Sequence, residues 1–95
     1  MKFVTSIKPK HLYLLKDKDM AEIVHCVSYD EEKDAYLLNT VHVIKQSVVG
    51  DYDITVWDVT PKDVSDSPAE SPDFNDLGFA FYEIGTKEDH PEYFL

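Results

Sequence analysis

The chain has 95 residues, of which 43% are hydrophobic and 13% aromatic, and its nineteen acidic residues against nine lysines give a net charge of −10. A chain of this length forms one domain with one core, and its aromatic content argues against global disorder. The lack of arginine and the strongly negative field argue against direct binding of nucleic acid, which needs clustered cations.

The N-terminal part contains two short apolar runs. Residues 3–7 (FVTSI) are expected to form a first strand, which ends before Pro9. Residues 11–15 (HLYLL) form the second run, and residues 16–19 (KDKD) are a turn signal.

Residues 20–29 (MAEIVHCVSY) fit two patterns. Strict alternation sets one face of a strand, formed by Ala21, Ile23, His25, Val27 and Tyr29. A capping-box spacing at the start of the segment and apolar residues at helical intervals fit a helix instead. The β-branched content favours the strand, with the helix as the alternative.

The clearest strand signal follows a short charged segment. Residues 30–34 (DEEKD) read as a loop, and residues 35–45 (AYLLNTVHVIK) then alternate in polarity along their whole length. Residues 20–45 are therefore expected to form a hairpin whose tip carries four acids and one lysine.

Two more strands complete the expected fold. A turn around Gly50 leads into residues 52–59 (YDITVWDV), and residues 77–84 (LGFAFYEI) read as a largely buried strand. We expect a mainly β protein, with α+β as the alternative. It would be a single domain over residues 1–95, built as a curled sheet or barrel of five to six antiparallel strands with at most one short helix.

The segment between the last two strands is acidic. Residues 63–76 (DVSDSPAESPDFND) hold five carboxylates, three serines, two prolines and no cation. Proline disfavours regular structure here, so we expect a flexible acidic loop over residues 60–76 and an acidic C-terminal tail over residues 86–95. The two Ser-Pro pairs, at Ser67 and Ser71, are typical of turns and also fit proline-directed phosphorylation.

The sequence indicates no catalytic residues, no cofactor and no metal site. The four histidines lack metal-binding spacing, and the three glycines supply no phosphate-binding loop. Cys26 reads as a buried thiol rather than a nucleophile paired with His42, because no lysine lies near it and Glu22 would raise its pKa. We expect no enzymatic activity.

The same composition suggests a cytoplasmic protein, in the host cytoplasm if it is viral. A single cysteine forms no intrachain disulfide and gives no reason to expect an oxidising compartment. No apolar run approaches the length of a membrane span, and the N-terminus lacks a signal-peptide pattern.

Acids interleaved with aromatic residues mark a candidate partner-binding surface. Residues 50–95 carry twelve acids and two lysines. Interfaces concentrate binding energy in aromatic anchors, while the surrounding charge sets encounter rate and selectivity. The main candidates are Asp51, Tyr52, Asp53, Trp57, Asp58, Asp63, Asp66, Glu70, Asp73, Phe74 and Asp76. A secondary group is Asp30, Glu31, Glu32 and Asp34.

The hypothesis is a small inhibitor that covers the basic nucleic-acid-binding surface of a partner such as a nuclease. DNA-mimic proteins, among them anti-CRISPR proteins and nuclease or glycosylase inhibitors, act in this way, because their carboxylates occupy the cationic side chains that otherwise hold phosphates. The alternative is a structural or assembly subunit whose acidity serves solubility only. A β-barrel that binds a small molecule or metal is a third option.

One local resemblance fits the inhibitor class. Residues 24–38 (VHCVSYDEEKDAYLL) look like the strand, acidic turn and strand of the phage uracil-DNA glycosylase inhibitor, in which Val-His also leads into Tyr-Asp-Glu and then Leu-Leu. The Glu-Ser-Ile edge strand of those inhibitors has no counterpart here, so we do not assign the chain to that family.

Overall fold

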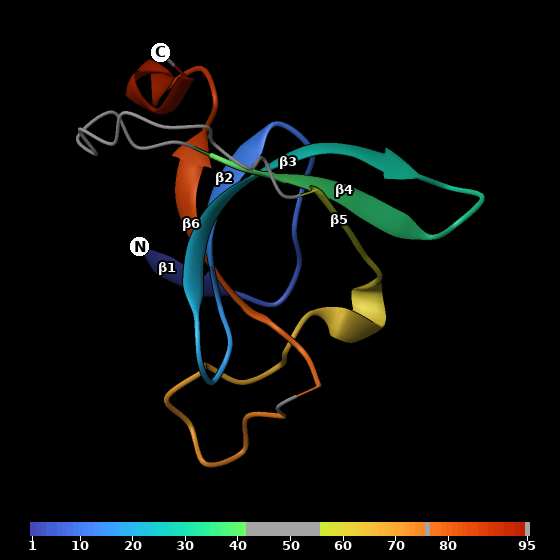
Figure 1. Cartoon of the computed structure of the whole chain (residues 1–95), viewed down its shortest axis with the longest axis vertical. Helices are drawn as coiled ribbons and strands as arrows, with labels where there is room; N and C mark the ends of the chain where they lie inside the picture. Colours follow the sequence, from blue (N-terminus) through green and yellow to red (C-terminus); the bar gives the residue numbers. More distant parts are fainter. Residues whose placement is uncertain (42–55, 76, 95) are drawn as a thin grey trace.

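The chain forms an open antiparallel sheet in the computed structural model, which describes residues 1–41, 56–75 and 77–94 (Figure 1). Within these residues the sheet has six strands in the order β1-β6-β2-β3-β4-β5. The strands are β1 (Lys2–Val4), β2 (His11–Lys16), β3 (Ala21–Asp30), β4 (Ala35–Thr40), β5 (Val56–Val59) and β6 (Ala80–Thr86), and the two 3-10 turns are η1 (Pro61–Asp63) and η2 (Pro91–Phe94).

The mainly β prediction is confirmed, and the sheet is open rather than closed into a barrel. β1 and β5 are its two edges in the described residues, and every paired neighbour is antiparallel. The helical alternative for residues 20–29 is wrong, since β3 covers this segment and pairs with β2 and β4. The expected strands at 42–45 and 52–55 lie outside the described residues.

One face of the central strands holds the hydrophobic core. The register sets Tyr13 opposite Val24, Cys26 opposite Leu38, and Leu15 opposite Phe81, and all of these side chains are at most 1% exposed. The rings of Tyr13 and Phe81 meet edge to face, 5.9 Å apart. The hydroxyl oxygen of Tyr13 accepts the backbone N–H of Lys8 at 2.8 Å, so its polar atom is satisfied at the edge of the core.

A β-bulge in β3 changes which side chains share this face. The pairing shifts between Cys26 and Ser28, so Cys26 lies opposite Leu38 while Tyr29 lies opposite Tyr36. Leu38 and Tyr36 are two residues apart on β4 and share a face. Tyr29 therefore lies on the same face as Cys26, whereas plain alternation put it with His25. The extra residue reverses the alternation beyond the bulge.

The short turns are closed by polar groups. The expected turn at residues 16–19 forms because the Asp17 carboxylate accepts the backbone N–H groups of Asp19 and Met20, each at 2.8 Å. The expected strand at residues 77–84 begins later, at Ala80, and Leu77 is 86% exposed. The cause is a turn in which Asn75 accepts the N–H groups of Leu77 and Gly78.

The end of β6 depends on a glycine. Gly85 has φ +152°, a conformation that side chains disfavour, and a Cβ there would lie 2.6 Å from Nε2 of His90. The His90 ring therefore occupies the space that a side chain at position 85 would take. It also packs against Tyr93 of η2, with ring centroids 6.0 Å apart.

Replacing Leu38 by alanine should lower the free energy of unfolding by about 2–5 kcal/mol, because it opens a cavity in the core. Leu38 is 0% exposed. Leu77→Ala is the matched control, since the same atoms are removed from an exposed side chain, and it should change stability by no more than about 0.5 kcal/mol. Urea unfolding of both variants measures the difference, and equal losses would contradict this core.

Candidate protein-binding site

The acidic tip is here defined as residues 30–34, the last residue of β3 and the turn that leads into β4. Its shape comes from its own side chains, since Oδ1 of Asp30 accepts the backbone N–H groups of Glu32 (2.9 Å) and Lys33 (3.3 Å). Asp34 has φ 48°, which lets the chain reverse into β4. All five residues are exposed, and the hairpin reaches out from the rest of the sheet (Figure 1).

An aromatic pair supports the base of the acidic tip. The hydroxyl of Tyr29 donates a hydrogen bond to Oδ1 of Asp34 at 2.5 Å, and the Tyr29 and Tyr36 rings pack with centroids 4.8 Å apart. The hydrogen bond to Asp34 is the main reason that the pKa of Tyr29 is raised to about 12. Tyr29 is 38% exposed, so part of its ring surface faces solvent while the hydrogen bond and the ring contact fix its orientation.

The first part of the 60–76 segment is held by its own carboxylate. Oδ2 of Asp63 accepts both the backbone N–H and the hydroxyl of Thr60 at 2.9 Å, which closes η1. Val64 then forms a parallel bridge with Phe79, and Val64 and Ser65 are buried. The Asp63 carboxylate therefore stabilises the turn in which it lies.

Further along, Glu70 attaches the same segment to the sheet. Its carboxylate accepts Lys16 Nζ on β2 at 2.9 Å and the hydroxyl of Tyr82 on β6 at 2.8 Å. The Tyr82 hydroxyl oxygen also accepts the backbone N–H of Ala69. The hydrogen bond from Lys16, followed by that from Tyr82, lowers the pKa of Glu70 to about 2.

The serines of this segment lie in turns. The Ser65 hydroxyl donates to the Ser67 carbonyl at 2.7 Å and accepts the Ser67 N–H. The Ser71 hydroxyl accepts the N–H of Asp73, and the Ser71 carbonyl accepts the N–H of Phe74. These bonds agree with the turn interpretation of both Ser-Pro pairs.

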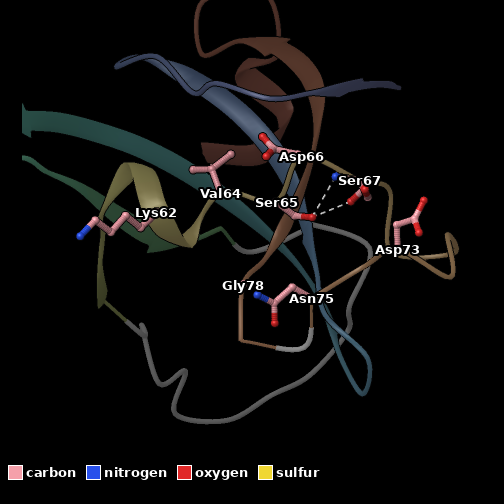
Figure 2. A pocket seen from close by; sticks show the side chains of 8 residues that line it. All are labelled: Lys62, Val64, Ser65, Asp66, Ser67, Asp73, Asn75 and Gly78. Atoms are coloured by element: carbon pink, nitrogen blue, oxygen red, sulfur yellow. Dashed lines mark hydrogen bonds between the residues drawn. The ribbon is translucent and has the colours of Figure 1, made fainter.

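A cavity of about 270 Å³ lies inside the folded segment (Figure 2). Its lining is polar apart from one valine and one glycine, and consists of Lys62, Val64, Ser65, Asp66, Ser67, Asp73, Asn75 and Gly78. The Ser65 hydroxyl is already bonded within the loop. Ligand pockets usually combine apolar walls with a few polar groups, and this cavity lacks the walls.

Apart from Asp58 on β5, the described carboxylates among the sequence-predicted site residues lie in two segments, the acidic tip and the 60–76 segment, which occupy different parts of the molecule (Figure 1). Asp58 is exposed on β5, Asp66 and Asp73 are exposed at the cavity, and Phe74 is half-buried. Trp57 is half-buried and packs against the core. Asp51, Tyr52, Asp53 and Asp76 lie outside the described residues.

Tyr29 and Val27 are surface residues that the sequence did not single out. They are 38% and 37% exposed, although both lie in an apolar strand segment. Their exposure follows from the bulge and from the length of β3 beyond β2. A bulge cannot be recognised from the polarity pattern of one strand. The acidic turn at residues 30–34 was the sequence feature that pointed to this end of the hairpin as a candidate surface.

The described geometry gives no support to Cys26 as a nucleophile or to a metal-binding site. Cys26 is 0% exposed, and burial raises its pKa to about 11. Burial also lowers the pKa of His25, and His42 lies outside the described residues. In the described part of the chain no three His, Cys, Asp or Glu side chains are grouped to hold a metal ion.

The Cys26 thiol should therefore react with a disulfide reagent at about pH 8 only as fast as the protein opens. Adding urea below the unfolding midpoint should accelerate labelling. A thiol that labels at the rate of a free peptide in native buffer would show that Cys26 is accessible.

The Glu70 carboxylate should titrate far below an ordinary glutamate, with a midpoint near 2 against 4.5. Because its folded pKa is lowered, it stabilises the fold above pH 4.5, and this contribution disappears as the pH falls towards 2. Carbon-detected NMR of the side chain measures the midpoint. Lys16→Met should move it up towards 4.5, and Lys18→Met on the neighbouring turn should leave it unchanged.

Neither of the 3-10 turns in the described ranges has the length or apolar character of a helix that crosses a membrane. Comparisons of the chain with protein-family models, with curated proteins and with solved structures find no match.

Proposed function

We propose that this protein is a small inhibitor whose acidic tip binds the basic nucleic-acid-binding surface of a partner enzyme and blocks access of DNA or RNA. The observation that carries the proposal is the tip itself. Four carboxylates stand on one exposed five-residue turn, with the partly exposed ring of Tyr29 at its base. An aromatic anchor next to concentrated charge is the arrangement that protein interfaces use.

The acidic tip is a better candidate than the 60–76 segment, because its charges do less for the fold. The carboxylates of Asp63 and Glu70 are engaged in closing a turn and tethering a loop. In the tip, the Asp30 carboxylate accepts two local hydrogen bonds and the Asp34 carboxylate accepts one. The side chains of Glu31 and Glu32 are exposed. Four like charges on so short a turn repel one another, which opposes folding.

A surface of this kind is suited to a cationic protein. Carboxylates can contact the lysine and arginine side chains that otherwise hold phosphates, and a field of one sign speeds the encounter. Nucleases, DNA glycosylases and CRISPR effectors present such surfaces. Inhibition would require no chemistry by this chain, and it would take place in the cytoplasm, where such enzymes meet nucleic acid.

The double substitution Glu31→Gln and Glu32→Gln should weaken binding to the partner by about tenfold or more. Purified protein is used to capture partners from a nuclease-treated lysate of the native host, at low and high salt. Each captured protein is then tested for nucleic-acid binding by mobility shift. The wild-type chain should abolish that binding, and the double variant should not.

Glu88→Gln with Asp89→Asn is the matched control, because it removes the same charge from an exposed turn that follows β6, away from the β3–β4 hairpin (Figure 1). It should inhibit as well as wild type. If both double variants lost inhibition equally, the effect would depend on net charge and not on the acidic tip. Partners that bind no nucleic acid, or binding insensitive to salt and to the tip, would favour the assembly-subunit alternative.

A further inference from the structure

Among the described residues, one edge of the hairpin that carries the acidic tip has no paired neighbour beyond Cys26. β2 pairs with β3 only as far as His25, which lies opposite Leu12, and the last backbone hydrogen bond on that side within the described residues is donated by the Lys10 N–H to the Cys26 carbonyl at 2.7 Å. β4 continues to pair with β3 as far as Asp30. Over residues 27–30, β3 therefore has a partner strand on one side only within the described chain.

This edge has the features of a docking strand. Residues 27–30 (VSYD) are all exposed, and they include neither lysine nor proline, two of the residues that commonly protect an edge from further pairing. The bulge lies at the start of this edge, and Ser28, Tyr29 and Asp30 beyond it are in regular register with β4. Val27 and Tyr29 add exposed apolar surface. An extended segment laid along such an edge gains main-chain hydrogen bonds, and alternate side chains of the edge give it selectivity.

We propose that an extended, lysine- or arginine-rich segment of the partner adds to the sheet as a strand along residues 27–30. This inference rests on the proposed function and specifies its binding mode. The acidic tip directly continues the edge, so basic side chains of the added strand come within reach of Asp30, Glu31 and Glu32. The backbone provides the pairing and the tip provides the preference for positive charge.

A second copy of this chain is a poorer occupant of the edge. Two copies that pair through residues 27–30 would bring two acidic tips to the same short ladder, and each tip carries four carboxylates against one lysine. The ladder would be only four residues long, so the like charges of the two tips would repel one another at short range. Charge complementarity therefore selects a basic segment.

The test uses a synthetic peptide of about eight residues in which lysine alternates with valine or threonine, the length of an ordinary strand. A second peptide has the same sequence with N-methyl groups on its central amides, which keep the charge but remove the hydrogen-bond donors. Affinities for the full chain are measured by fluorescence anisotropy at about 50 mM and about 300 mM salt. Amide chemical shifts locate the site.

The unmodified peptide should bind at low salt and shift the amides of residues 27–30. The methylated peptide should bind about tenfold more weakly, since each main-chain hydrogen bond contributes on the order of 1 kcal/mol. Glu31→Gln with Glu32→Gln should weaken binding of the unmodified peptide, and Glu88→Gln with Asp89→Asn should not.

Equal affinity of the two peptides, with the same dependence on the tip, would overturn strand addition and leave tip-directed inhibition standing. Binding of neither peptide, shifts located elsewhere, or a concentration-dependent dimer that broadens residues 27–30 would also overturn it. The proposed function fails separately, when the captured partners bind no nucleic acid or are indifferent to the tip.

Discussion

Burial of one face of β2, β3, β4 and β6 is the constraint on which the rest of the structure depends. The fully buried side chains of Tyr13, Val24, Leu38 and Phe81 lie on this face, and each is matched across the ladder by another core residue. A slip of one residue in any of these pairings would expose a whole row of apolar side chains. The register is therefore fixed in the middle of the sheet, and departures from it are confined to bulges. The bulge in β3 lies where the core ends and directs Tyr29 towards the hairpin's outer end.

The features that sequence reasoning found are the local ones. Alternating polarity over residues 35–45 and a run of charges at residues 30–34 are readable in a short window, and they identified the β3–β4 hairpin and its tip. The bulge between Cys26 and Ser28 depends on what the neighbouring strand offers, so the pattern of one strand does not reveal it. The bond between Lys16 and Glu70 joins residues 54 positions apart, and no local pattern predicts such a pair. The start of β6 was missed because the Asn75 turn competes with the strand propensity of Leu77.

The carboxylates of this chain have two different roles, although they are chemically alike. In the 60–76 segment they accept hydrogen bonds that shape the loop and attach it to β2 and β6, which gives the acidity a structural explanation there. At the hairpin end, Asp30 and Asp34 shape the turn, but Glu31 and Glu32 add charge that the described contacts do not require for folding. Composition alone weights all nineteen acids equally. Separating the two roles requires the hydrogen-bond partners of each carboxylate, and those partners depend on the folded backbone.

The close approach of His90 to Gly85 has an evolutionary consequence. The imidazole fills the volume beside a backbone carbon that carries no side chain, so the two positions share one space. A descendant of this chain could acquire alanine at position 85 only after the ring had left and the backbone had relaxed to an ordinary conformation. Substitutions at the two sites should therefore appear as a pair, and the order in which they arise should be histidine first.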